Sequence, residues 1–137
     1  MAPHVLLVED EPHIAEAICF ILSRDGWEVT HLAEGDRVLA AVRRLAPALV
    51  ILDQQLPGLS GLDLLGALRA DPATADLPVL MLTARGHPRD REAAVRAGAS
   101  HFMAKPFSNA EMRAAVRALT APGLPAASAP ASAPGAA

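Results

Sequence analysis

The hydrophobic residues of this chain gather in four short runs, and each run is followed at its carboxyl end by polar residues. The runs cover residues 5–8, 48–52, 79–82 and 101–104. Four or five apolar residues are too few for a helix, but they suit a strand that is buried on both faces, as in a parallel sheet. A more alternating segment near residues 27–32 predicts a further strand at the edge of that sheet.

The segments between these runs have the period of amphipathic helices. Ile14, Ile18 and Ile21, for example, stand at i, i+4 and i+7. Pro12 suits the first position of the helix that they would form. Strands and helices therefore alternate along the whole chain, which predicts an α/β fold with helices on both faces of a parallel sheet.

The polar residues that follow the strands form one candidate site. They are Glu9 with Asp10, then Asp53, Thr83 and Lys105. Because the carboxyl ends of parallel strands meet at one edge of a sheet, we expect these side chains to converge there. Three carboxylates, a hydroxyl and an amine suit a divalent cation and an incoming phosphoryl group. Lys105 is also the only lysine among the twelve basic residues.

Carboxylates that converge in this way need a counter-charge. Two unit charges 4 Å apart repel by about 4 kcal/mol at an effective dielectric constant near 20. Mg²⁺ would offset this repulsion and still leave room for phosphate oxygens. The backbone carbonyl of Gln55, in the turn-rich loop after Asp53, is a further candidate ligand. Asp53 would then be the nucleophile that forms an aspartyl phosphate, with Lys105 and Thr83 contacting the phosphoryl oxygens.

The composition fits a single globular domain. Of the 137 residues, 52% are hydrophobic and 20% are charged. The net charge of −3 and the pI near 5.9 argue against direct binding to nucleic acid, which needs a basic face. No apolar run reaches membrane-spanning length and the start of the chain lacks the pattern of a signal peptide, so we expect a cytoplasmic protein without a membrane contact. The single cysteine, Cys19, fits that reducing compartment as a packed thiol.

The last seventeen positions, residues 121–137, have a different composition from the rest. They consist of alanine, proline, serine, glycine and one leucine. Because this segment has no apolar period to bury, we expect a disordered tail or linker after a domain of residues 1–120.

Five short motifs, in order and at fixed separations, carry a family resemblance. They are VLLVEDEP at residues 5–12, the spacing from Asp53 through Pro57 to Gly61, LTARG at 82–86, AGA at 97–99, and Phe102 placed three residues before KPF at 105–107. Each motif is weak alone, but all five in this order are specific. The chain resembles the receiver domain of two-component response regulators over residues 4–120.

The resemblance implies a flavodoxin-like fold, which is a doubly wound, five-stranded parallel sheet of strand order 2-1-3-4-5 in a (βα)5 arrangement. It implies that Glu9, Asp10 and Asp53 hold Mg²⁺. It also implies that Asp53 accepts a phosphoryl group from a histidine kinase or a histidine phosphotransfer protein, and that Lys105 contacts that group. The peptide bond between Lys105 and Pro106 is expected to be cis, as in the family.

The same resemblance implies a signalling role rather than that of an enzyme with a separate substrate. Thr83 and Phe102 would form a switch pair. This pair would change the surface made by the fourth helix, the fifth strand and the fifth helix, roughly residues 87–119, and so signal to a protein partner. A phosphorylation-dependent homodimer is a further assembly that the family allows.

Other interpretations of the same residues lead to different functions. A phosphohydrolase of the haloacid dehalogenase type needs a second acid two residues after its nucleophile, where this chain has Gln55. A flavin or nucleotide carrier needs a phosphate-binding loop after the first strand, where this chain has acids that would repel phosphate. A pseudo-receiver that only docks or dimerises stays open. So does the choice between a stand-alone receiver and the first part of a longer regulator.

Overall fold

A computed structural model describes residues 3–56, 59–84 and 88–120 of the chain. The predicted tail, residues 121–137, lies outside the described residues. So do residues 57–58 and 85–87, which belong to two of the sequence motifs.

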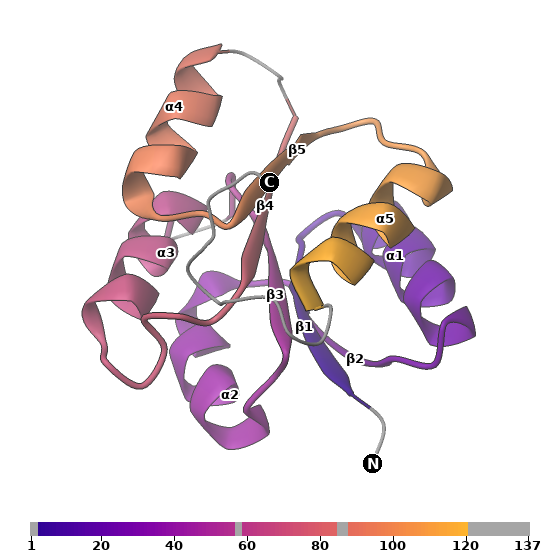
Figure 1. Ribbon diagram of the computed structural model, residues 1–137, viewed down its shortest axis with the longest axis horizontal. Coiled ribbons are helices and arrows are strands. Elements are labelled where there is room, and N and C mark those ends of the chain that lie inside the picture. Colours follow the sequence, from indigo (N-terminus) through magenta and orange to yellow (C-terminus); the bar gives the residue numbers. More distant parts are fainter. Residues whose placement is uncertain (1–2, 57–58, 85–87, 121–137) are drawn as a thin grey trace.

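Five parallel strands form one sheet in the order β2-β1-β3-β4-β5, as predicted (Figure 1). The more alternating segment, now β2, lies at an edge of the sheet, which also confirms the sequence interpretation. The strands are β1 (His4–Val8), β2 (Glu28–Leu32), β3 (Leu49–Asp53), β4 (Val79–Thr83) and β5 (His101–Ala104).

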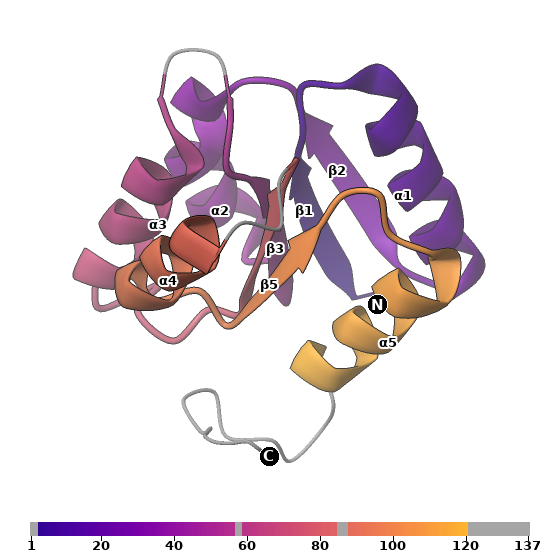
Figure 2. The same cartoon turned by 90° about the horizontal axis from the view of Figure 1, so that it is seen from above.

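Helices cover both faces of the sheet (Figure 2). Two of them, α1 and α5, pack on one face, and the other three pack on the opposite face. Within the described ranges, no helix is long and apolar enough to cross a membrane. The helices are α1 (Pro12–Arg24), α2 (Val38–Leu45), α3 (Gly61–Ala70), α4 (Pro88–Ala97) and α5 (Asn109–Thr120), with a 3₁₀ turn, η1 (Gly35–Arg37), before α2.

The core has two layers because successive side chains of a strand point to opposite faces of the sheet. In β1, Val5 and Leu7 pack with α1 and α5, whereas Leu6 and Val8 pack with the three helices of the other face. All four side chains are fully buried. Burial on both faces explains why this strand reads as a continuous apolar run in the sequence.

Candidate functional site

The carboxyl edge of the sheet brings the predicted residues close together. Asp53 and Thr83 are the last residues of β3 and β4, and Glu9 and Lys105 follow directly after β1 and β5. Glu9, Asp53 and Thr83 are buried, at 0%, 3% and 2% exposure, whereas Asp10 is exposed to solvent. The site therefore has a buried floor and one acid at its open side.

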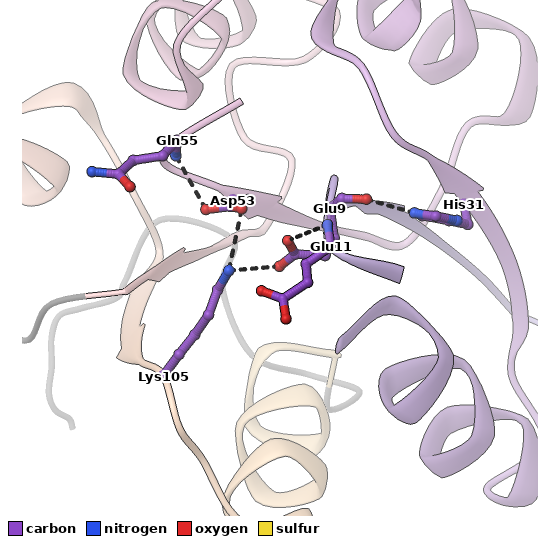
Figure 3. Close-up of polar contacts among 6 residues, drawn as sticks. All are labelled: Glu9, Glu11, His31, Asp53, Gln55 and Lys105. Carbon is purple, nitrogen blue, oxygen red and sulfur yellow. Dashed lines mark hydrogen bonds and ion pairs between the residues drawn. The ribbon is translucent and has the colours of Figure 1, made fainter. Parts of the chain in front are cut away.

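Lys105 lies between the two buried carboxylates (Figure 3). Its Nζ is 2.9 Å from Glu9 Oε1, and it donates a hydrogen bond to Asp53 Oδ2 at 3.2 Å. Its backbone N–H donates to the Thr83 carbonyl at 2.7 Å, and the bond to Pro106 is cis, as the resemblance implied. Burial alone would lower the pKa of the Lys105 ammonium, but the two carboxylates outweigh burial and raise that pKa above its ordinary value.

Glu9 is held by three hydrogen bonds and one ion pair. Its N–H donates to the Leu32 carbonyl at 3.0 Å, and its carbonyl oxygen accepts from His31 Nε2 at 2.6 Å. Oε2 accepts from the Glu11 N–H at 3.1 Å, and Oε1 forms the ion pair with Lys105. Burial raises the pKa of the Glu9 carboxyl from 4.5 to about 7. The Asp53 carboxyl adds to the rise, and Lys105 and the Glu11 N–H oppose it.

Asp53 is held by its own loop as well as by Lys105. Its Oδ1 accepts a hydrogen bond from the Gln55 N–H at 3.1 Å. The loop closes where the Gly61 N–H donates to the Gln54 carbonyl at 2.9 Å. A Cβ on Gly61 would meet the Asp53 carbonyl oxygen at 2.3 Å, so only glycine allows this approach. The spacing from Asp53 to Gly61 in the sequence thus has a steric reason.

The three acids suit a divalent cation. Glu9, Asp10 and Asp53 each offer a carboxylate oxygen, and these oxygens lie within 4.8 Å of one another. Glu9 Oε1 is buried and accepts no hydrogen bond among the described residues, so its only counter-charge there is the Lys105 ammonium. An all-oxygen set with one solvent-exposed member is what Mg²⁺ prefers, because it keeps several water ligands.

Thr83 and Phe102 lie on the face of the sheet that α2, α3 and α4 cover, opposite the face that α1 and α5 cover. Phe102 is half-buried and packs with Met81 in the cluster beneath α2, α3 and α4, and the two residues are partners in the β4–β5 register. Thr83 stands two residues after Met81 on the same strand, so strand alternation places it on the same face of the sheet as Phe102.

Two features of the site were not predicted from the sequence. The first is the contact of His31 with Glu9, which depends on the register of β2 against β1 and has no signal in the spacing of the two residues. The second is the role of Lys105 as counter-charge. The sequence predicts a metal ion in that role, but the structure places an ammonium group against both buried carboxylates.

Comparison with known proteins agrees with this geometry. Residues 5–117 match the family described as the response regulator receiver domain. The chain belongs to this family. Its fold is also that of solved receivers: a putative response regulator from Chloroflexus aurantiacus has a TM-score of 0.85 and 35% identity, over 88% of this chain and 99% of that one. A receiver domain is a signalling domain, so the interpretation as a phosphohydrolase is not supported.

Relatives of this receiver include whole transcriptional regulators. The phosphate regulon transcriptional regulatory protein PhoB of Klebsiella pneumoniae is 39% identical over 119 residues, which cover 87% of this chain and 52% of PhoB. The DNA-binding response regulator MtrA of Mycolicibacterium smegmatis is 38% identical over 118 residues, which cover 86% of this chain and 50% of MtrA. The chain thus spans about half the length of these relatives.

These relatives overturn one expectation. The net charge of −3 predicts that nucleic acid is not a direct partner, but MtrA is a DNA-binding protein by name and PhoB is a transcriptional regulator. This prediction is wrong because a net charge averages over a whole chain, and this chain spans only about half the length of such regulators. The net charge therefore does not decide whether nucleic acid is a partner.

Proposed function

We propose that this receiver accepts a phosphoryl group on Asp53 from a phosphohistidine of a histidine kinase or a histidine phosphotransfer protein. One carboxylate oxygen of Asp53 attacks the phosphorus. The P–N bond breaks, and its electron pair stays on the imidazole, which then takes up a proton. The observation that carries the proposal is the position of Asp53, almost fully buried at the sheet edge with its Oδ2 hydrogen-bonded to Lys105.

Glu9, Asp10 and Asp53 are the residues that would hold Mg²⁺, together with the Gln55 carbonyl. When bound, the ion supplies positive charge that neutralises the oxygens of the transferring group and orients them for an in-line displacement. Asp10 is the exposed member of the three acids, so the site is open to solvent on the side where Asp10 lies.

Lys105 supplies the second positive charge. Its Nζ already contacts the carboxylate that is to be modified, so an incoming phosphoryl oxygen meets an ammonium group that needs no reorganisation. The flexible stem and compact charge of lysine allow the ammonium to follow the phosphoryl oxygen as the bond forms.

The output of the switch would pass through Thr83 and Phe102. The Thr83 hydroxyl donates to a phosphoryl oxygen and moves toward Asp53, and Phe102 turns into the space behind it. The surface that changes consists of α4, β5 and α5. Among the described residues of α4, only Ala94 is buried, so few apolar contacts hold that helix in place.

Mass spectrometry of the protein treated with phosphoramidate and Mg²⁺ tests the proposal. We expect one added phosphate that hydroxylamine removes, because an acyl phosphate reacts with hydroxylamine and a phosphoserine does not. Asp53→Asn should abolish the modification, and Asp63→Asn, a change of an exposed acid on α3, should keep it. A wild-type protein that takes up no phosphate would instead support the pseudo-receiver interpretation.

A further inference from the structure

We propose that His31 is a positioning residue that fixes the acidic turn after β1 for cation binding. This inference rests on the proposed function, because it concerns the same site. His31 lies on β2, the edge strand next to β1, and its ring reaches the backbone of Glu9 and not the carboxylates (Figure 3).

The direction of this hydrogen bond is determined by its acceptor. Nε2 of His31 lies 2.6 Å from the Glu9 carbonyl oxygen. A carbonyl oxygen can only accept, so Nε2 carries the proton and donates it. The same requirement selects the Nε2–H tautomer when the ring is neutral.

Among the described residues, the hydrogen bond from His31 is the one that the strands make to the carbonyl of the peptide between Glu9 and Asp10. The pairing of β1 with β2 ends at Val8 and Leu32, and the Glu9 N–H still donates to the Leu32 carbonyl. The Glu9 carbonyl belongs to the next peptide unit, which leads to Asp10. His31 thus extends the contact between the two strands by one peptide unit, through a side chain.

The orientation of this peptide decides where two candidate ligands point. Glu9 faces the buried floor and Asp10 faces solvent, so a rotation of the peptide plane between them would change the angle between their carboxylates. A cation needs both oxygens in place before it binds. A group that orients a ligand from behind typically changes metal affinity by tenfold or more when it is removed.

Direct Mg²⁺ titration followed by the backbone amide resonances of the whole chain tests this inference. His31→Ala removes the donor, and His31→Gln keeps an amide N–H at a similar reach. His4→Ala is a matched control, because His4 Nε2 lies 2.6 Å from Thr30 Oγ1 between the same two strands, at the end of β1 away from the site. The free energy of unfolding of each variant is measured in parallel.

We expect the Mg²⁺ dissociation constant of His31→Ala to rise about tenfold. His31→Gln should stay within about threefold of wild type, and His4→Ala should bind as wild type even if it is less stable. With phosphoramidate at saturating Mg²⁺, His31→Ala should be modified at close to the wild-type rate, because only the cation dependence has changed. In the wild type, the His31 ring should show the Nε2–H tautomer in long-range ¹H–¹⁵N spectra.

Unchanged Mg²⁺ affinity in His31→Ala would overturn the inference, and so would equal losses in His31→Ala and His31→Gln or in His31→Ala and His4→Ala. Failure of the proposed function would look different: neither the wild type nor any of the His31 variants would be phosphorylated on Asp53.

Discussion

Lys105 and Glu9 form a buried ion pair, with Nζ 2.9 Å from Oε1, although two strands of the sheet lie between the strands that they follow. Glu9 follows β1 and Lys105 follows β5, and β3 and β4 lie between these strands. The long lysine side chain crosses the carboxyl ends of both. Glu9 is also one of the three acids that would hold a divalent cation, so the cation and the Lys105 ammonium would share its carboxylate as counter-charges.

Lys105→Met should destabilise the metal-free protein at pH 8. The change keeps an unbranched side chain but leaves the buried Glu9 and Asp53 carboxylates facing each other without a counter-charge. We expect a loss on the order of 2 kcal/mol, measured by urea unfolding in EDTA. Arg113→Met is the control, since its ion pair with Asp25 is more exposed and should contribute less than about 1 kcal/mol. Equal losses in the two variants would show that the burial of the Lys105 pair has no consequence.

Glu9 should make the metal-free protein less stable as the pH rises. Burial raises the pKa of Glu9 in the folded protein to about 7, from 4.5. The folded state therefore holds a proton that the unfolded chain has already released between these values, and the free energy of unfolding falls as the pH rises through this window. We expect Glu9→Gln to remove a pH-dependent difference on the order of 2 kcal/mol between pH 5 and pH 8. Parallel pH profiles of the two proteins in EDTA would contradict the raised pKa.

Millimolar Mg²⁺ should raise the melting temperature of the wild type. A ligand that binds only the folded state stabilises it by about 2.7 kcal/mol at a hundredfold excess over its dissociation constant. Asp10→Ala should reduce this shift strongly, and because Asp10 is exposed the change should have little effect on the metal-free protein. Glu92→Ala, which removes an exposed acid on α4, should keep the full shift. If Asp10→Ala responds to Mg²⁺ as the wild type does, the cation binds elsewhere.

Thr83→Ala should separate modification from switching. BeF₃⁻ on Asp53, which stands in for the phosphoryl group, should still bind, but the amide resonances around Phe102 and across α4 should change less than in the wild type. Burial of an aromatic side chain is worth roughly 1.5–3 kcal/mol, enough to shift a two-state surface tenfold or more. Thr74→Ala is the control, since Thr74 is also a buried hydroxyl but donates to the Leu68 carbonyl away from the site. A wild-type response in Thr83→Ala would point to a different route for the signal.

Gly61→Ala and Gly66→Ala should have opposite effects on stability, although both glycines lie in α3. A Cβ at position 61 would meet the Asp53 carbonyl oxygen at 2.3 Å, whereas one at position 66 meets nothing within 4 Å. We expect urea unfolding to show a loss of about 2 kcal/mol for Gly61→Ala and a gain of about 0.5–1 kcal/mol for Gly66→Ala. Phosphorylation should slow only in Gly61→Ala. A neutral Gly61→Ala would mean that the loop after Asp53 moves without penalty.

The amino-acid sequence by itself determined the alternation of strands and helices, and which residues lie at the carboxyl edge of the sheet. Continuous apolar runs such as residues 48–52 identify strands buried on both faces, because such strands have no polar side to interrupt them. Asp53 and Thr83 could be assigned to the site for the same reason, since the end of a parallel strand determines which edge its last side chain reaches. The strand order came from the motifs, because periodicity carries no information about which strands are neighbours.

Only the tertiary structure decided how the site residues contact one another. Glu9 and Asp10 are neighbours in the sequence, yet one is fully buried and the other is exposed, because side chains alternate where β1 ends. Lys105 meets Glu9 from 96 positions away, and His31 meets it from 22. Such contacts depend on strand register and on the distance that a side chain crosses between elements. Neither quantity is written in the local pattern of hydrophobic and polar residues.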